Sequence, residues 1–227
     1  MDLTDFPHLA KAVNRWLSYQ VLCGRGSLLS EAYLGHPMAE FLMHLHSGKF
    51  ETEEDHPVLS SPGPGRPKQI DYVLRTRDTE DLAVAIECKW VSGKPYDKQR
   101  IVNDILRLEC VRVVGRHVKR YFLVAGLSED FGKNFSRLTV NVGKARAAFT
   151  KHFLSFSVKY PNCTVEARSG PVHFRKYYAA FADDFNATVP KALKTSLVGK
   201  RTADGITVCI WQISSSPNRA PFLPLKQ

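Results

Sequence analysis

The stretch IDYVLRTRDTEDLAVAIECKW, residues 70–90, predicts a β-hairpin and decides the fold of this chain. Side chains alternate along a strand, so each of its strands has one apolar face and one mixed face. The apolar faces carry Leu82, Val84, Ile86, Cys88 and Trp90 on the second strand, and Ile70, Tyr72 and Leu74 on the first. The mixed faces carry Ala83, Ala85, Glu87 and Lys89, and Asp71, Val73 and Arg75. An acid and a base thus stand on an otherwise apolar strand.

The polar turn RDTED, centred on Thr79, sets the register of this hairpin. A slip of one residue would bring the apolar face of one strand against the mixed face of the other. The predicted pairs are Arg75 with Ala83, Val73 with Ala85, and Asp71 with Glu87. Directly opposed residues have Cβ atoms about 4.5–5.5 Å apart. Two carboxylates therefore meet side by side, with Lys89 one step along the same face.

Two like charges opposed across a sheet are destabilising unless something neutralises them. A divalent cation would do so, and carboxylate oxygens suit magnesium. The two small residues, Ala83 and Ala85, are expected to leave room above the sheet for a substrate. Lys89 could then orient or activate a water, or stabilise charge on a phosphate. The alternative is a solvated face with a surface salt bridge, which contributes little to stability.

Asp71, Glu87 and Lys89, with the order of elements over residues 27–127, resemble the PD-(D/E)XK nuclease superfamily. The resemblance implies an α/β fold with a restriction-endonuclease-like core, in which helices flank a mixed central β-sheet. It also implies that Asp71 and Glu87 bind Mg²⁺, for which Mn²⁺ can substitute, and that Lys89 is the catalytic lysine. Ile70 stands where the name of the motif has proline.

Many relatives in that superfamily add a glutamate from the helix before the hairpin. Glu31 is the first choice for this third metal ligand here, and Glu40 is the second. Because they are nine positions apart, they would face opposite sides of an unbroken helix. Only one should reach the site, unless the break expected at Pro37 reorients the second half. An ordinary exposed carboxylate is the alternative for either residue.

The balance of charge favours a polyanionic partner. Lys and Arg outnumber Asp and Glu by 32 to 22, which gives a formal charge of +10. The candidate nucleic-acid contacts around the hairpin are Arg66, Lys68, Lys94, Lys98, Gln99 and Arg100. DNA is favoured over RNA, since that is what the resemblance most often implies. Gln99 is followed at the fourth position by Asn103 rather than tyrosine, so the recombination-type exonuclease pattern is not supported.

The 227 residues are expected to form one domain, residues 1–227, with a core over about 27–127. Helices are predicted at 8–23, at 27–48 with a break at Pro37, at 97–114, at 141–152 and at 175–197 with a break at Pro190. Strands are predicted at 120–127, 153–160 and 206–213, and a loop at 49–68. The extension at 150–227 could complete the sheet, form a dimer surface or contact substrate.

The cysteines and the N-terminal sequence bear on location. The five cysteines are widely spaced and form no C-x-x-C pair, which indicates a reduced, cytoplasmic compartment. The first residues show no secretory signal, and no stretch has the roughly 20 apolar residues of a membrane span. His36, Glu40 and His44 share a helical spacing, but they do not form the H-E-x-x-H pattern of a zinc site.

These observations favour a Mg²⁺-dependent nuclease that acts on DNA, in a defence, restriction or repair role. One alternative is a non-catalytic nucleic-acid-binding or scaffolding module of the same fold. Another is a nuclease subunit that is active only in a larger protein complex. A homodimer would fit double-strand cleavage, which usually requires two active sites.

Overall fold

The computed structural model describes residues 6–45, 49–59, 68–93, 98–111, 117–135, 139–140, 153–166, 172–185 and 192–215. Its centre is a seven-stranded sheet in the order β1-β2-β3-β4-β9-β8-β7. The strands are β1 (Lys49–Asp55), β2 (Gln69–Arg75), β3 (Leu82–Val91), β4 (Lys119–Leu127), β7 (Asn162–Glu166), β8 (Ala192–Ala203) and β9 (Ile206–Ser215). Only the neighbours β3 and β4 of this sheet are parallel. The sheet is therefore mixed, as predicted.

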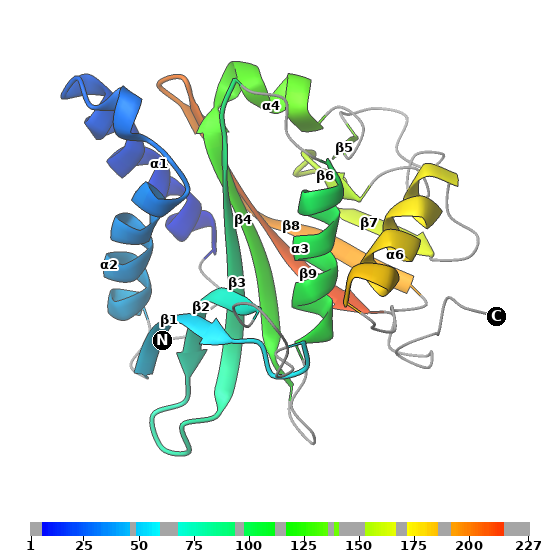
Figure 1. The fold of residues 1–227 in the computed structure, drawn as a ribbon. Helices are drawn as coiled ribbons and strands as arrows, with labels where there is room; N and C mark the ends of the chain where they lie inside the picture. Colours follow the sequence, from blue (N-terminus) through cyan, green and yellow to red (C-terminus); the bar gives the residue numbers. More distant parts are fainter. Residues whose placement is uncertain are drawn as a thin grey trace.

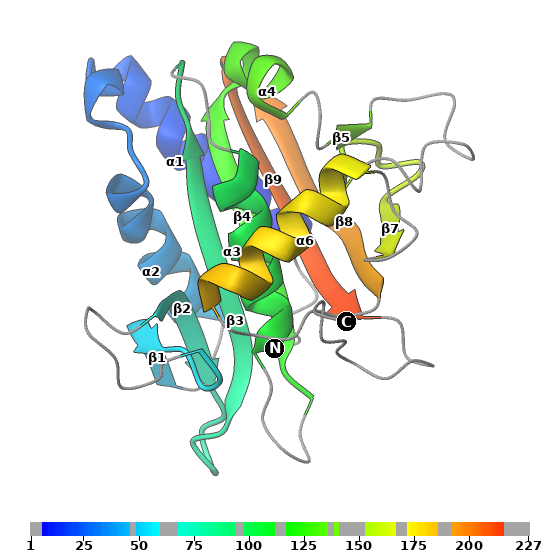
Figure 2. The same ribbon diagram turned by 45° about the vertical axis from the view of Figure 1, so that its right-hand side comes forward.

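Helices cover both faces of the sheet and make a three-layer α/β arrangement (Figures 1 and 2). On one face lie α1 (Phe6–Leu22) and α2 (Gly35–Leu45), joined through the short 3-10 turns η1 (Gly26–Leu28) and η2 (Ala32–Leu34). On the other lie α3 (Lys98–Cys110) and α6 (Val172–Phe185). The helix α4 (Ser128–Phe135) directly follows β4, and β5 (Thr139–Val140) pairs with β6 (Leu154–Ser155) outside the main sheet. The α/β class and the flanked mixed sheet are thus confirmed.

The hairpin is present, and its register differs from the prediction at one end. Val73 pairs with Ala85 as expected. An irregularity between Leu74 and Arg75 places Arg75 opposite Leu82, so the predicted pairing of Arg75 with Ala83 is wrong. At the other end the paired positions stop at Tyr72 and Ile86, so the predicted pairing of Asp71 with Glu87 is not part of the backbone ladder. A bulge of this kind inserts one residue into a strand, and the hydrophobic pattern alone does not reveal it.

The sheet face that carries Asp71 and Glu87 is covered by α3, so the expectation of an open surface above it is wrong. Ala85 is fully buried in the same apolar cluster as Ile101 and Ile105 of α3. Ala83 packs against the cluster on the opposite face of the sheet. The two small residues therefore admit a helix on one side and neighbouring side chains on the other, so the space predicted directly above them is filled by protein.

Four other predictions are corrected by the structure. Residues 49–55 form the edge strand β1 instead of a loop, and residues 192–203 form β8 instead of a helix. Pro37 lies in the first turn of α2, where proline is tolerated, so the helix begins there and is not divided. Of the strand expected at 153–160, only Leu154–Ser155 pairs, and the helix expected at 141–152 lies outside the described residues.

The C-terminal third completes the sheet, which was one of the roles left open for it. β8 and β9 form a hairpin whose turn residues, Asp204 and Gly205, both have positive φ. This is the conformation that Asp-Gly favours in tight hairpins. β9 then pairs with β4 and joins the two halves of the sheet. No helix among the described residues is both long and apolar enough to cross a bilayer.

Candidate active site between the hairpin and the third helix

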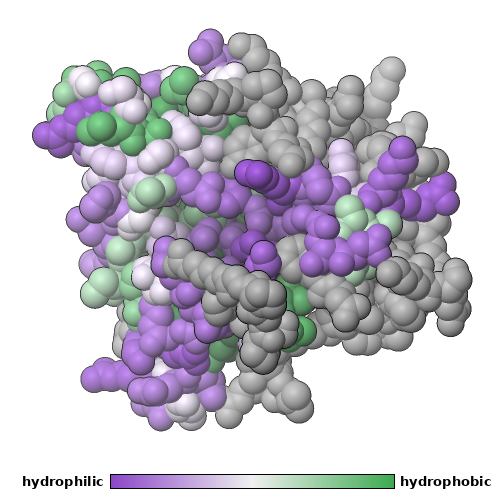
Figure 3. All heavy atoms as spheres, viewed as in Figure 1, coloured by the Kyte–Doolittle hydropathy of each residue, from purple (hydrophilic) through white to green (hydrophobic). Residues whose placement is uncertain are grey.

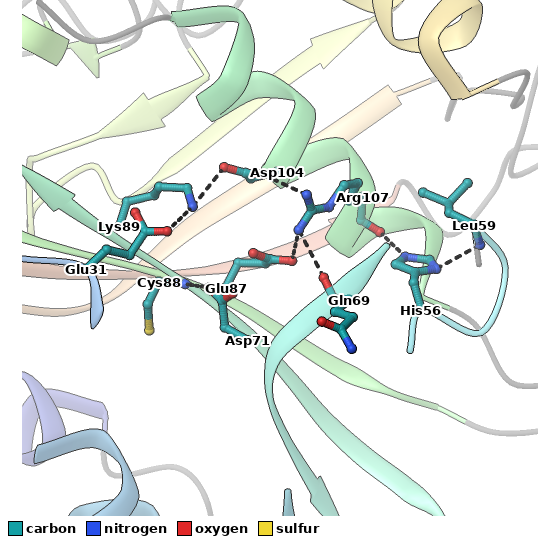
Figure 4. A network of polar contacts seen from close by, with 10 residues as sticks. All are labelled: Glu31, His56, Leu59, Gln69, Asp71, Glu87, Cys88, Lys89, Asp104 and Arg107. Atoms are coloured by element: carbon teal, nitrogen blue, oxygen red, sulfur yellow. Dashed lines mark hydrogen bonds and ion pairs between the residues drawn. The ribbon is translucent and has the colours of Figure 1, made fainter. Parts of the chain in front are cut away.

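The hairpin brings Asp71 of β2 next to Glu87 and Lys89 of β3. Where the backbone ladder stops, an Oδ2 atom of Asp71 accepts a hydrogen bond from the backbone N–H of Cys88 at 2.7 Å. The carboxylate thus takes the place of a backbone acceptor and is held against the strand (Figure 4). The side chain of Cys88 points into the apolar cluster of the opposite face, as predicted. Burial raises the pKa of its thiol well above the usual range.

Glu87 is only 1% exposed, so the alternative of a solvated face is wrong for this residue. Its partner is Arg107 of α3, whose Nη2 lies 2.5 Å from Oε1 of Glu87 and 3.1 Å from the carbonyl oxygen of Gln69. The other carboxylate atom, Oε2, is buried without a hydrogen-bond partner. An unsatisfied buried polar group costs about 1–3 kcal/mol, and more when it is charged. Oδ2 of Asp104 and Oε2 of Glu109 are also buried without a hydrogen-bond partner, so what sets Glu87 apart is the neighbouring carboxylate of Asp71.

Lys89 lies between two carboxylates, one buried and one exposed. Its Nζ is 2.7 Å from Oε1 of Glu31 and 3.4 Å from Oδ2 of Asp104. Asp104 also pairs with Arg107 through Oδ1 at 3.3 Å, one turn along α3. The side chain of Glu31 is 45% exposed and that of Asp104 is 8% exposed. The lysine therefore has one fixed partner on α3 and one partner that solvent can reach.

Of the two glutamates considered as a third ligand, Glu31 is the one that reaches the site. It lies at the start of η2, outside any α-helix, and ion-pairs with Lys89. Glu40 is exposed on α2, the helix that packs on the opposite face of the sheet. The helix expected over 27–48 is confirmed around Glu40, in α2, and is wrong around Glu31, where short 3-10 turns replace its first part.

The electrostatics of the cluster are dominated by burial. Burial and the neighbouring Asp71 raise the pKa of Glu87, while Arg107 acts in the opposite direction. Burial also raises the pKa of Asp104, against the effect of Lys89. For Lys89, burial lowers the pKa, but Asp104 and Glu31 outweigh it, and the pKa lies above its usual value. Lys89 is therefore an ammonium group at neutral pH, a donor and not a general base.

The composition of the cluster fits a divalent cation. Its four carboxylates, Glu31, Asp71, Glu87 and Asp104, face two cations, Lys89 and Arg107, which leaves two negative charges unbalanced when all are ionised. No group of three or more His, Cys, Asp or Glu side chains in the described part of the chain is arranged to hold a metal. Mg²⁺ commonly uses one or two carboxylates and keeps several waters. The pair of Asp71 and Glu87, with the unpartnered Oε2, meets that lower requirement.

His56 holds the backbone of Arg107 in place through a hydrogen bond. Nδ1 of His56 accepts hydrogen bonds from the backbone N–H groups of Val58 at 3.1 Å and Leu59 at 3.0 Å. The proton is therefore on Nε2, which donates to the carbonyl oxygen of Arg107 at 2.9 Å. Burial lowers the pKa of His56 to about 4, so the ring is neutral at physiological pH. The contact ties the end of β1 to the turn of α3 that carries Arg107.

Of the predicted nucleic-acid contacts, the structure describes the side chains of Gln99, Lys68 and Arg100. Nε2 of Gln99 donates to Oδ1 of Asn103 at 2.6 Å and to the carbonyl oxygen of Tyr177 at 3.1 Å, so its amide joins α3 to α6. Lys68 and Arg100 are exposed, before β2 and at the start of α3. Arg66 and Lys94 lie outside the described residues, as does the side chain of Lys98.

The spacing of His36, Glu40 and His44 has an ordinary explanation. The ring of His36 packs at 6.4 Å from that of Trp16 and at 5.6 Å from that of Tyr33. His36 thus joins the start of α2 to α1 and η2 through ring contacts.

Sequence reasoning missed Asp104 and Arg107 as members of the site. A signal was present, because Arg100, Asn103, Asp104 and Arg107 form a polar stripe on an otherwise apolar helix. The stripe does not say which strand it faces, and that depends on how α3 packs on the sheet. No family model, curated protein or solved structure matches this chain.

Proposed function

We propose that this chain is a metal-dependent nuclease with a restriction-endonuclease-like core, and that it hydrolyses phosphodiester bonds in DNA. The observation that carries the proposal is the buried carboxylate of Glu87, which has the carboxylate of Asp71 as a neighbour and lies two positions before Lys89 on the same strand. Burying such a group is costly unless it binds something. A purely structural glutamate would gain nothing from a second carboxylate next to it.

In this proposal Asp71 and Glu87 hold Mg²⁺ or Mn²⁺, and Glu31 can join them when it leaves Lys89. The ion would activate a water and stabilise the charge that develops on the phosphate. The protein residues do the positioning: the backbone N–H of Cys88 holds Asp71, and Arg107 holds Glu87. Such hydrogen-bonded support of metal-binding carboxylates is a general feature of metal sites.

Lys89 has a separate role in the proposed reaction. Because its pKa is raised, it carries a proton at neutral pH and donates hydrogen bonds. It can orient the attacking water or contact a phosphate oxygen, where a preorganised cation stabilises the transition state. Its contact with the exposed Glu31 is the one that a phosphate could replace, because Asp104 is buried and stays in place.

The surface is compatible with a nucleic-acid substrate. Hydrophilic residues cover the middle of the face drawn in Figure 3, between α2 and α3. Lys68 and Arg100 are exposed on the segments that flank the cluster. Together with the net charge of +10, they would provide phosphate contacts, which orient a duplex without reading its sequence.

A non-catalytic nucleic-acid-binding or scaffolding module is the second candidate, and one observation favours it. Lys89 and Arg107 are already paired with carboxylates of the cluster, so the charges also read as a structural network. The two functions differ in their need for metal. A binding module would hold DNA equally well in chelator, with a steep dependence on salt.

The deciding experiment is a cleavage assay on supercoiled plasmid, linear duplex, single-stranded DNA and RNA, in magnesium, manganese or chelator. Lys89→Ala and Asp71→Ala are compared with wild type, and Lys194→Ala, an exposed lysine on β8, is the charge-matched control. Cleavage that requires metal, disappears in the two site variants and persists in the control would support the nuclease. Wild-type protein that binds magnesium and cuts nothing alone would point to a subunit that needs a partner. Wild-type protein that neither binds metal nor cuts would reject the proposal.

A further inference from the structure

We infer that Asp104 and Arg107 are positioning residues, and that each holds one residue of β3 in place for the proposed reaction: Arg107 holds Glu87 and Asp104 holds Lys89. This inference rests on the proposed function and deepens it. The two residues of this helix then have separate tasks. Arg107 supports metal binding because it holds Glu87, and Asp104 supports the contact with the transition state because it holds Lys89.

The geometry pairs opposite charges one to one across the gap between strand and helix. Glu87 and Lys89 are two positions apart on β3 and therefore point to the same side. Asp104 and Arg107 are three positions apart on α3 and share a helix face. Figure 4 shows the four side chains pointing toward one another. Glu87 of the strand faces Arg107 of the helix, and Lys89 of the strand faces Asp104 of the helix. The contact between Asp104 and Arg107 at 3.3 Å closes the set.

Arg107 fixes Glu87 in one orientation. Its Nη2 bonds both Oε1 of Glu87 and the carbonyl oxygen of Gln69, and its Nη1 contacts Asp104. A planar guanidinium with partners on both of these nitrogens cannot turn without losing one of them. The carboxylate of Glu87 is thereby set with Oε1 toward the arginine and the unpartnered Oε2 away from it. A lysine at position 107 would keep the charge and lose this two-sided hold.

Asp104 fixes Lys89 in a different way. It is buried, whereas Glu31, the other partner of Lys89, is half exposed. When substrate or metal draws Glu31 away, Asp104 still attracts the ammonium and keeps it on this face of the sheet. An asparagine at position 104 would keep the shape of the side chain and remove the charge. The lysine would then be free to follow Glu31 or to reach solvent.

The test uses the full-length chain and two independent measurements. Calorimetric titration gives the affinity for Mn²⁺ without substrate, and cleavage kinetics at saturating metal give kcat and KM. The variants are Arg107→Lys and Asp104→Asn, with Asp104→Glu as the conservative replacement. Arg120→Lys is the matched control, because Arg120 forms the other buried arginine–glutamate pair that involves α3, with Glu109. Circular dichroism and thermal melting are used to check that each variant is folded.

Arg107→Lys is expected to weaken metal binding by about 10- to 100-fold, the usual effect of losing a residue that supports a metal ligand. Asp104→Asn is expected to leave the metal affinity within about 3-fold and to lower kcat by about 10- to 100-fold, with partial recovery in Asp104→Glu. Arg120→Lys should change neither quantity. Equal losses of metal affinity and kcat in both site variants, or losses no larger than those in Arg120→Lys, would overturn the inference while leaving the nuclease intact. If wild-type protein neither binds Mn²⁺ nor cuts, the proposed function fails first and the inference fails with it.

Discussion

Two buried glutamate–arginine pairs involve α3, and the surroundings of their glutamates differ. Glu109, in the last turn of the helix, pairs with Arg120 of β4 at 3.2 Å, and Arg120 also donates to the backbone carbonyl of Glu109 at 2.9 Å. Glu87 pairs with Arg107, but the charge of the neighbouring Asp71 also acts on it and raises its pKa. One pair is a local match of opposite charges. The other belongs to a cluster in which four carboxyl groups face two cations, which is expected where a cation binds and unexpected in a structural contact.

The largest expected effect is a loss of cleavage, which should follow from a change at Glu87 and not from a change at Glu109. Glu87→Gln should reduce metal-dependent cleavage by more than about 100-fold, because a proposed ligand loses its charge. Its free energy of unfolding in chelator should change by less than about 1 kcal/mol, since the substitution also relieves repulsion from Asp71. Plasmid cleavage and urea unfolding measure the two quantities. Normal cleavage by the folded variant would remove Glu87 from the site.

Glu109→Gln should show the reverse pattern. Removing the charge breaks the buried ion pair between Glu109 and Arg120, and breaking such a pair typically costs about 3 kcal/mol. Urea unfolding measures this loss of stability. At temperatures where the variant remains folded, its cleavage rate should stay close to that of wild type. If this variant were as inactive as Glu87→Gln, the distinction between the two pairs would be wrong.

Magnesium should stabilise the protein by binding beside the pair of Glu87 and Arg107, and not beside the pair of Glu109 and Arg120. An ion that binds the folded state alone adds about 2.7 kcal/mol at 100 times its dissociation constant. Thermal melting of wild-type protein should therefore shift upward with magnesium, and that of Asp71→Asn should not. Glu109→Gln should keep the full shift although its melting temperature starts lower. The same shift in Asp71→Asn would place the ion elsewhere.

The support that His56 gives to Arg107 should make stability depend on pH. The folded protein holds the ring neutral with a pKa of about 4, whereas the usual value is about 6.5. As the pH falls, the unfolded chain takes up the proton first, so this contribution is complete above about pH 6.5 and is lost toward pH 4. Between pH 7 and pH 5 the loss should be about 2 kcal/mol.

The contribution of His56 is measured by urea unfolding at both pH values, as the difference between wild type and His56→Gln. Taking the difference removes the contributions of other titrating groups, including the buried carboxylates. Equal pH dependence in the two proteins would show that His56 is not held neutral in the fold.

The smallest effect is expected at Glu31. Its carboxylate is half exposed, and an exposed ion pair contributes about 0–1 kcal/mol. Glu31→Gln should leave the free energy of unfolding unchanged within that range and lower cleavage by less than about 10-fold. A loss as large as that of Glu87→Gln would make Glu31 a full metal ligand, equal to the two carboxylates of the hairpin.

The hairpin and the apolar strands were predictable because their side chains follow a clear period. The alternation over 82–90 placed Glu87 and Lys89 on one side, and the buried strand at 120–127 was also found. β1 was missed because an edge strand covered on few sides carries charges at most positions, as in KFETEED. In such a strand the buried and exposed positions differ too little in hydropathy for the strand to be predicted from the sequence.

β8 was missed although the sequence contained a signal for it. Residues 192–203 include Ala, Leu and Lys, which favour helices, and they followed a segment that does form a helix. The dipeptide Asp204–Gly205 is a strong hairpin signal, and it outweighs that weak propensity. Asp104 and Arg107 were visible as a polar stripe, but the strand they face follows from the packing of α3 and not from local sequence.

The two ion pairs between β3 and α3, Glu87 with Arg107 and Lys89 with Asp104, also limit which substitutions this chain can accept during evolution. Positions 87 and 107 carry opposite charges that need each other, and so do positions 89 and 104. A single change at any of them removes at least one ion pair from this connected set, so surviving descendants should alter these positions in pairs or lose all four together. Sequences that keep the acid–lysine alternation of the strand should therefore also keep an acid and a base three positions apart on the following helix. That joint pattern spans both elements and is a sharper search query than the short motif alone.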